Sequence, residues 1–382
     1  MSSQFCVVGS GFSGAIIART LADMSFHVDV IESRDHIGGN CYTYRDKTTG
    51  ILVHKYGPHI FHTDNLRVWN YIQQFSDFKP YTNRVKATAR GSVYSLPINL
   101  HTINQVFGMT LGPSAAARLI SEKADSSIKE PQNFRDQALS LIGPELYELF
   151  FEGYTLKQWE INPAELPASI LKRLPVRFDY NDSYFNHSIQ SMPTDGYTPI
   201  FERILDHPKI NVVLNTSFSS ANSSNYEHIF YTGPIDAWFG YSLGRLPYRT
   251  LDFEPFYGEG DFQGNAVINY CDIAVPFTRI TEHKHFSPWE KHEQTIYFKE
   301  YSKHCSDRDE PYYPVRFAGQ NQLLDQYKAL AKQLSNVSFL GRLGTFRYMD
   351  MDVTILEALN ASDTIVSYLS NKTSLPPFFA TI

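Results

Sequence analysis

The clearest pattern of apolar and polar positions lies at the start of the chain. Residues 5–8 form a short apolar run that ends at a glycine, which is typical of a buried strand in a parallel sheet. Apolar residues then recur at helical spacing between residues 15 and 22, and a second apolar run, 28–31, ends at Glu32. The pattern predicts a strand, a glycine turn, a helix and a second strand.

The predicted turn has the spacing Gly-x-Gly-x-x-Gly. Gly9 permits the tight turn, Gly11 lets the backbone approach a pyrophosphate, and Gly14 lets the helix pack closely on the strand. Glu32 follows about 20 residues later and can accept hydrogen bonds from a ribose hydroxyl. In this context the motif predicts a Rossmann-like dinucleotide site, and a glycine turn without a ligand is the alternative.

The remaining pattern predicts insertions into this unit. Residues 100–150 read as helical, with apolar faces at 115–120 and 138–142 between prolines. Between residues 176 and 300, the aromatic and β-branched runs favour a mainly antiparallel sheet; these runs are 211–214, 266–270 and 295–298. A last strand at 338–340 and a helix from Asp352 are expected to return to the first domain.

Composition narrows the class of protein. A chain of 382 residues predicts two to three domains at roughly 150 residues each. With 42% hydrophobic and 19% charged residues, the chain is not disordered or fibrous. The net charge is -6 and no block of five like charges occurs, so nucleic acid is an unsuitable main partner. A local pair of arginines still allows an anionic small molecule to bind.

Other residue types argue against several kinds of site. The four cysteines are far apart, which disfavours a zinc site or a disulfide framework and suits a reducing compartment. His54, His59 and His62 invite comparison with metal ligands, but Gly57 and Pro58 break any helix between them, so no metal is predicted. No apolar stretch is long enough to span a bilayer, and no basic region precedes an apolar one at the N-terminus. We therefore expect a cytoplasmic protein.

Longer motifs carry a family resemblance. Residues 32–40 extend the glycine fingerprint in a way that resembles FAD-binding proteins of the amine-oxidase superfamily. Further segments, in a consistent order along nearly the whole chain, resemble the UDP-galactopyranose mutases, and the length suits their bacterial type; the segments are 54–63, 153–159, 175–178, 231–236, 262–269, 282–286 and 311–315.

The resemblance implies a definite chemistry. Enzymes of this family interconvert UDP-galactopyranose and UDP-galactofuranose without net redox, for cell-surface polysaccharide synthesis, and they require reduced FAD. N5 of the reduced flavin forms a covalent adduct with the sugar while its ring opens and recloses. The protein then positions the sugar, stabilises the departing UDP and excludes water.

The resemblance also assigns residues. Arg173, in a lid near 166–176, and Arg279 would stabilise the diphosphate, and His62 would lie beside the flavin ring. The implied cofactor-binding residues are Gly9, Gly11, Phe12, Ser13, Gly14, Glu32, Ser33, Gly39, Asn40, His59, Ile60, Arg342, Tyr348, Asp350 and Met351. The implied substrate-binding residues, besides the two arginines, are Asn83, Phe151, Tyr154, Thr155, Trp159, Tyr184, Arg249, Asn269, Tyr313 and Tyr348.

The expected fold class is α/β, a Rossmann-like FAD-binding domain interrupted by a helical insertion and a mainly antiparallel sheet domain. We assign the FAD-binding domain to residues 1–77, 220–250 and 338–382, and the helical insertion, with a homodimer contact implied by the family, to 78–150. The sheet and substrate domain takes 151–219 and 251–337.

Three other activities stay open on the sequence alone. The substrate can be a related nucleotide sugar, UDP-N-acetylgalactopyranose or dTDP-fucopyranose, because one methyl or hydroxyl group contributes only about 1–3 kcal/mol of discrimination. The shared fold also allows an FAD-dependent oxidoreductase of the amine-oxidase type. A nucleotide-sugar binding protein without catalysis is the third alternative.

Overall fold

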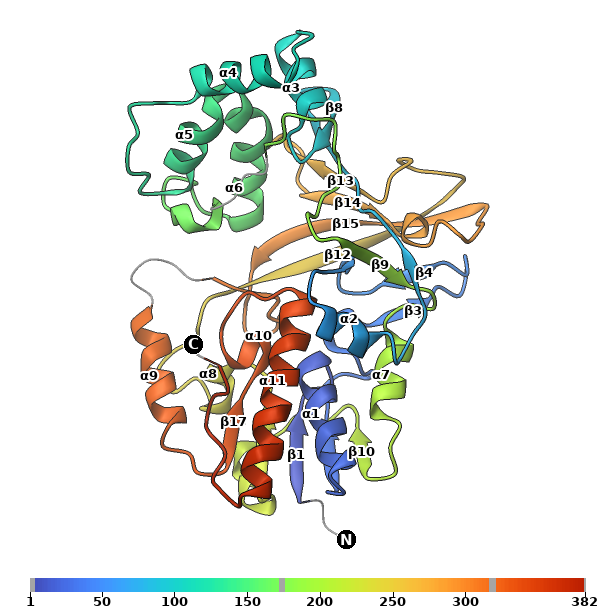
Figure 1. Cartoon of the computed structure of the whole chain (residues 1–382), viewed down its shortest axis with the longest axis vertical. Coiled ribbons are helices and arrows are strands. Elements are labelled where there is room, and N and C mark those ends of the chain that lie inside the picture. The colour runs from blue at the N-terminus through green and yellow to red at the C-terminus, as the bar shows by residue number, and fades with distance from the viewer. Residues whose placement is uncertain (1–3, 172–175, 316–320, 381–382) are drawn as a thin grey trace.

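The computed structural model describes residues 4–171, 176–315 and 321–380. Figure 1 shows a sheet with helices in the lower half, a group of helices at the top, and a second, strongly extended sheet between them. The two sheets and the helical group together correspond to the expected fold class.

The lower part contains a five-stranded parallel sheet. Its order is β10 (Ile210–Val213), β2 (Val28–Ile31), β1 (Phe5–Val8), β11 (His228–Tyr231) and β17 (Val337–Phe339). Strands of such a sheet are covered on both faces, which explains why their sequences are continuous apolar runs. The predicted strand, turn, helix and strand at the N-terminus are confirmed.

One strand assignment was wrong. Residues 211–214 were expected in the antiparallel sheet, but β10 pairs in parallel with β2, with Ile210 opposite Val28. The chain therefore returns to the parallel sheet before residue 219, where the predicted boundary of the substrate domain lay. A short apolar run has the same period in either sheet, so its sequence does not reveal which partner it pairs with.

Helices cover the two faces of the parallel sheet. On one face lie α1 (Phe12–Asp23), α7 (Thr198–Leu205) and α11 (Met351–Ser370), and the other face is covered by α8 (Ile235–Trp238) and α9 (Asn321–Ala331). Alternate strand residues divide between the two cores: Phe5 and Val7 pack under α1, and Cys6 packs under α8 and α9. Helix α11 begins one residue before the predicted start at Asp352.

A seven-stranded, mainly antiparallel sheet lies above this domain. Only β13 and β7 pair in parallel among its described strands. The order is β16 (Tyr313–Pro314), β12 (Tyr248–Glu259), β15 (Gln294–His304), β14 (Arg279–Glu282), β13 (Val267–Tyr270), β7 (Val85–Ala89) and β8 (Ser92–Leu96).

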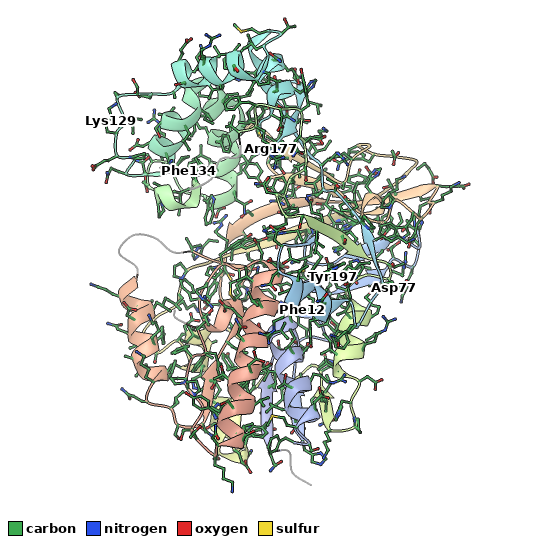
Figure 2. The ribbon with its side chains drawn as sticks, viewed as in Figure 1. Phe12, Asp77, Lys129, Phe134, Arg177 and Tyr197 are labelled. Carbon is green, nitrogen blue, oxygen red and sulfur yellow. The ribbon has the colours of Figure 1, made fainter. Side chains whose placement is uncertain are left out.

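The helical group follows β8. It contains α3 (Leu100–Phe107), α4 (Pro113–Lys123), α5 (Phe134–Tyr147) and, after a π-helical turn, α6 (Gly153–Trp159). The predicted insertion range 78–150 thus begins with strands, and its helices continue to residue 159. Arg177 lies where this group meets the sheet (Figure 2), and its amide donates to the Ile98 carbonyl at 2.9 Å.

Short elements complete the fold. Two small sheets are formed by β3 (Thr43–Arg45) with β4 (Leu52–His54), and by β5 (Phe61–Thr63), β9 (Ile189–Pro193) and β6 (Phe78–Pro80). The short helices α2 (Leu66–Ile72) and α10 (Gly341–Gly344) pack near α11. Among the described helices, none has the length and apolar character that a membrane crossing requires.

Buried neutral histidines predict acid sensitivity. Burial lowers the pKa of His228 to about 4, and its Nε2 lies 2.8 Å from the Ser338 hydroxyl. A histidine whose pKa is lower in the folded protein contributes stability above pH 6.5 that is lost as the pH falls toward 4. His228→Gln should therefore reduce the acid dependence of the unfolding free energy by about 1.4 kcal/mol per pH unit in this window.

Denaturant unfolding between pH 4 and 7 measures this slope. His101→Gln, at an exposed position of α3, is the matched control and should leave the slope unchanged. An identical slope in the His228 variant and the wild type would contradict the prediction.

Candidate functional site

The glycine turn leaves the start of α1 open. Gly9 has a φ of +98°, and a Cβ there would lie 2.1 Å from the Thr232 hydroxyl oxygen. Gly14 packs so closely that a Cβ would lie 1.9 Å from the Gly9 carbonyl oxygen. No side chain caps the helix at Gly11, so the first amides of α1 have no intrahelical acceptor. Such a helix start can bind a phosphate.

Glu32 lies at the end of β2, beside this turn. Its Oε2 accepts hydrogen bonds from the Ser10 amide at 2.9 Å and the Ser10 hydroxyl at 2.7 Å. Its Oε1 accepts a hydrogen bond from the Arg34 amide at 3.1 Å and a longer one, 3.4 Å, from the Ser33 hydroxyl. The carboxylate is therefore fixed in one orientation, as a group that selects a ribose should be.

The loop after β2 approaches the same turn. A Cβ on Gly11 would lie 4.0 Å from the Gly39 Cα, so these two backbones face each other. Arg34 holds the loop by donating from Nη2 to Asn40 Oδ1 at 2.9 Å and to Glu310 Oε2 at 3.0 Å. Two predicted cofactor residues, Gly39 and Asn40, are thus brought to the predicted glycine turn.

The C-terminal segment reaches α1 from the other side. At Gly341, where φ is +76°, a Cβ would lie 2.9 Å from the Ser13 hydroxyl oxygen. A small hollow lies here, lined among others by Ser13, Gly341 and Ala358. Helix α11 begins after Asp350, whose side chain does not cap it, although the Val353 amide donates to Asp352 Oδ1 at 2.8 Å. The starts of α1 and α11, neither of which is capped by the side chain of its N-cap residue, therefore both lie among the predicted cofactor-binding residues.

Two predicted site histidines lie close together in the chain: His59 just before β5, and His62 in β5. Nδ1 of His59 lies 2.9 Å from the Gly57 carbonyl oxygen, so it carries the proton, and burial with nearby Arg342 lowers the His59 pKa to about 4. His62 stacks on Phe185 with 3.7 Å between ring centroids, and burial lowers its pKa also. Both rings are neutral at neutral pH.

Arg279 occupies the first position of β14, between two neighbouring strands. It is opposite Asn269 on β13 and Glu300 on β15. Its Nε lies 3.2 Å from Glu300 Oε1, and its Nη2 donates to the Tyr154 hydroxyl at 2.9 Å. Burial opposes the charge, but Glu300 and Tyr154 hold the pKa of Arg279 well above its ordinary value. The guanidinium is a permanent positive charge.

Three tyrosines predicted to bind substrate lie near this charge, and a fourth, Tyr348, lies beside Tyr313. The Tyr154 hydroxyl accepts a hydrogen bond from Arg279, and Tyr313 and Tyr184 lie close enough to contribute to its raised pKa. The Tyr313 ring lies 5.9 Å from that of Tyr348 and 5.6 Å from the guanidinium carbon of Arg342. Tyr313 therefore lies between Arg279 of the upper sheet and Arg342, one of the predicted cofactor-binding residues.

Several predicted substrate residues carry buried polar atoms without a partner. Within the described parts of the chain, no hydrogen bond reaches Oδ1 of Asn83, Oδ1 of Asn269 or Nε of Arg249. Buried polar atoms in proteins are nearly always paired, so these atoms indicate a polar ligand or ordered water. The backbone of Asn83 is itself fixed, since its carbonyl accepts the Tyr184 amide at 2.8 Å.

The charge of Arg249 already has a partner. The side chain is only 4% exposed; its Nη1 donates to Glu160 at 2.7 Å and its Nη2 donates to the Ser302 hydroxyl at 3.1 Å. Glu160 adopts the left-handed conformation that ends α6, with a φ of +52°. The ion pair therefore ties the end of α6 to β12.

The aromatic residues predicted for the uridine pocket lie around α6. Phe151 and Trp159 pack partly buried against the cluster formed by Phe134 and its neighbours, and Thr155 is buried. The structure thus places them together, although partial packing in a core is an equally ordinary role for such residues. Arg173 and part of the predicted lid lie outside the described residues, while Leu166 and Leu171 are buried in the same cluster.

Some residues of the site were missed. Glu300, which is 3% exposed, pairs with Arg279, and Glu160 pairs with Arg249. Lys157 joins α6 to the connection between β13 and β14. Isolated acidic or basic residues give no sequence signal of this kind, because their partners are distant in the chain. Strand register reveals the pair of Glu300 with Arg279, and the packing of α6 on the sheet reveals the contacts of Glu160 and Lys157.

One group of metal-ligand residues occurs within the described residues, formed by Asp261, Glu282 and His285. Glu282 already accepts the amides of Phe262 at 2.9 Å and Gln263 at 2.8 Å, and Lys284 lies 2.8 Å from Asp261. These contacts join the loop that follows β12 to the end of β14, so the three side chains already have protein partners.

Comparison with known proteins places this arrangement in a family. A family model described as UDP-galactopyranose mutase matches residues 149–348, which is more than half of the chain. The chain belongs to the UDP-galactopyranose mutase family. A model of the NAD(P)-binding Rossmann-like domain matches residues 7–75. The predicted family, fold class and enzyme class are confirmed.

Relatives and solved structures agree with this membership. A Klebsiella pneumoniae protein named as a probable UDP-galactopyranose mutase is 58% identical over 377 residues, 99% of this chain and 98% of its own. The Escherichia coli dTDP-fucopyranose mutase is 51% identical over 95% of this chain and 98% of its own. A structure of reduced UDP-galactopyranose mutase has a TM-score of 0.74 at 16% identity, covers 96% of both chains, and shows the same fold.

The close packing at Gly14 gives a prediction for this family member. Gly14→Ala places a methyl group on the Gly9 carbonyl, so α1 must move away from β1. We expect a loss of about 2–4 kcal/mol of unfolding free energy. Gly112→Ala is the control, since this glycine has an ordinary φ of -80° and open space around it. Equal melting temperatures for the two variants would contradict the account of the turn.

Proposed function

We propose that the chain interconverts UDP-galactopyranose and UDP-galactofuranose with reduced FAD as its cofactor. The observation that carries the proposal is the partly exposed guanidinium of Arg279, which Glu300 and Tyr154 hold in place beside the tyrosine that adjoins Arg342. A diphosphate needs such fixed donors, and a neutral substrate does not. Similarity over 99% of the chain to a probable UDP-galactopyranose mutase supports the same substrate.

The residues of the lower domain fit FAD. The uncapped start of α1 would receive the pyrophosphate, and the fixed Glu32 carboxylate would accept the ribose hydroxyls. Gly39, Asn40 and Arg342 adjoin the same region, and the uncapped start of α11 would direct amides at the isoalloxazine. When bound and reduced, FAD supplies N5 as the nucleophile for the anomeric carbon.

His59 and His62 would lie beside the flavin as neutral rings. Nδ1 of His59 carries a proton, which leaves Nε2 as a hydrogen-bond acceptor. His62 is held between Phe185 and His187, whose Nδ1 lies 2.7 Å from its own Nδ1. Neither ring adds a second positive charge next to the cofactor, so the charge of the site is concentrated at the arginines.

Departure of the nucleotide is the step for which the chain supplies electrostatic stabilisation. As the bond between the sugar and the diphosphate breaks, negative charge increases on the phosphate oxygens. Arg279 donates to these oxygens without reorientation, because Glu300 and Tyr154 already hold it. The hydroxyls of Tyr184, Tyr313 and Tyr348 would add donors, and Arg173 a second guanidinium. Phe151, Trp159 and Thr155 would contact the uridine.

A mutase for dTDP-fucopyranose is the second candidate. The E. coli enzyme of that name is 51% identical over nearly the same length. The two substrates differ by a hydroxyl on the hexose, by a methyl group on the base and by the 2′-hydroxyl of the ribose, and each difference contributes only about 1–3 kcal/mol in a pocket. Asn83 and Asn269, with unpaired amide oxygens, favour the sugar with the additional hydroxyl donor.

An amine-type oxidoreductase is less suitable, because an oxidase acting on a neutral amine has no use for a fixed, permanently charged guanidinium at its substrate site. A nucleotide-sugar binding protein without catalysis would show no conversion of UDP-galactofuranose when its flavin is reduced. The homodimer through the helical group, the cytoplasmic location and the role in cell-surface polysaccharide synthesis stay predictions from the family.

Turnover should depend on the reduced cofactor. We expect the purified yellow protein to convert UDP-galactofuranose with dithionite, and to show at most a small residual rate when fully oxidised. The measurement is chromatographic separation of the two UDP-sugars, with dTDP-fucofuranose as the competing substrate. Faster conversion of dTDP-fucofuranose would select the second candidate, and turnover with stoichiometric oxygen consumption would contradict both mutase activities.

Loss of the guanidinium should abolish turnover and leave FAD bound. Arg279→Ala alone leaves Glu300 buried without its partner, which costs about 3–5 kcal/mol of stability. The double variant Arg279→Ala/Glu300→Gln removes both charges and isolates the effect on catalysis. The control is Arg90→Ala, whose side chain is 65% exposed. Near-normal activity of the double variant, with flavin absorbance unchanged, would contradict the assigned role.

A further inference from the structure

Lys157 projects from α6 into a ring of backbone carbonyls. Its Nζ lies 2.6 Å from the Tyr270 carbonyl oxygen, 3.0 Å from that of Asp272, 2.9 Å from that of Val275 and 3.0 Å from that of Phe277. Tyr270 is the last residue of β13, and the other three residues belong to the connection between β13 and β14. An ammonium group has three donors, so the four acceptors fully occupy it.

The connection also has backbone hydrogen bonds of its own. They run from the Tyr270 amide to the Thr278 carbonyl at 2.9 Å, from the Val275 amide to the Asp272 carbonyl at 3.1 Å and from the Cys271 amide to the Thr88 carbonyl at 2.9 Å. The ammonium of Lys157 adds the contacts that join the connection to α6. Carbonyls that converge on one point repel each other unless a cation or a donor lies between them. The ammonium of Lys157 therefore lets the connection fold around the side of α6.

The first residue of α6 touches the same connection. A Cβ on Gly153 would lie 2.4 Å from the Cys271 carbonyl oxygen and 3.1 Å from the Ile273 amide nitrogen. Gly153 and Lys157 are four residues apart, so they lie on one face of the helix. That face is therefore fixed on the connection at two points, one by close backbone packing and one by the ammonium.

Helix α6 and the β13–β14 connection each adjoin a predicted substrate-binding residue. Tyr154 follows Gly153 on α6, and Arg279 follows the connection at the start of β14. The Tyr154 hydroxyl and Arg279 Nη2 are 2.9 Å apart, so a shift of α6 against the connection changes this contact first. Asn269, with its unpaired amide oxygen, precedes the connection on β13.

We propose that Lys157 is a positioning residue, whose ammonium holds the β13–β14 connection on α6 and thereby fixes Tyr154 against Arg279 for binding of the nucleotide diphosphate. The inference rests on the proposed function, in that Arg279 contacts the diphosphate. Lys157 itself touches backbone carbonyls only, so it acts through the two residues that it aligns.

A charge role and a packing role predict different results. Methionine fills the volume of the lysine stem but offers no donor, so Lys157→Met should behave like Lys157→Ala. The alanine variant leaves space for the stem, so a small primary ammonium ion, such as n-butylammonium, can enter and donate to the same carbonyls. Tetramethylammonium has the charge without N–H groups and serves as the matched ion.

Burial lowers the pKa of Lys157 to about 8, so the measurements are made at pH 7, where the ammonium is charged.

The experiment compares Lys157→Ala, Lys157→Met and Lys129→Ala in the flavin-loaded protein. Lys129 is exposed on the outer side of the helical group (Figure 2). We expect about a tenfold rise in KM for UDP-galactofuranose and in the Kd for UDP in both Lys157 variants, with flavin content and kcat changed much less. n-Butylammonium should restore most of the UDP affinity of Lys157→Ala, and tetramethylammonium should not.

Three results would overturn the inference. They are a Kd for UDP within twofold of the Lys129 variant, an effect confined to flavin content or folding in both Lys157 variants, and equal rescue by the two ammonium ions. Failure of the proposed function gives a different result, namely a wild-type protein that converts no UDP-galactofuranose when reduced. UDP titration then still tests the alignment of Tyr154 with Arg279.

Discussion

The ion pair between Arg279 and Glu300 is the interaction on which the rest of the site depends. A carboxylate that is 3% exposed is stable only beside a fixed positive charge, and cross-strand register places Arg279 beside it. Tyr154 of α6 then bonds to the same guanidinium, which adds a contact between the helical group and the sheet to those made by Arg249 and Lys157. The cost of burying the Glu300 carboxylate is offset by its attraction to Arg279, and the guanidinium is thereby held ready for an anion.

The position of this pair also indicates how the two domains would contribute to one site. Tyr313, on β16, lies next to Arg342, which follows the last strand of the parallel sheet. A substrate diphosphate at Arg279 and a cofactor at the uncapped helix starts would therefore meet near Tyr313. Arg249 has a structural role instead, because its charge is paired with Glu160 and the ion pair fixes the end of α6.

The sequence predicted the local elements more fully than the long-range contacts. The turn at Gly9, Gly11 and Gly14 was predictable because Gly9 and Gly14 leave no room for a side chain, and Gly11 lies where the backbone of Gly39 approaches the turn. Strand β10 was assigned to the wrong sheet, since pairing with β2 depends on residues far away in the chain. The diphosphate residues came from family resemblance, and neither Glu300 nor Lys157 could be found, because their partners are defined only by the folded register.

The affinity for UDP relative to uridine tests the central claim most directly, because the two ligands differ only in the diphosphate. Calorimetric titration of the wild type and of the double variant Arg279→Ala/Glu300→Gln gives this ratio while the base contacts remain. The account predicts that the double variant loses about 10- to 100-fold in UDP affinity and keeps its uridine affinity. An unchanged ratio of the two affinities would contradict it.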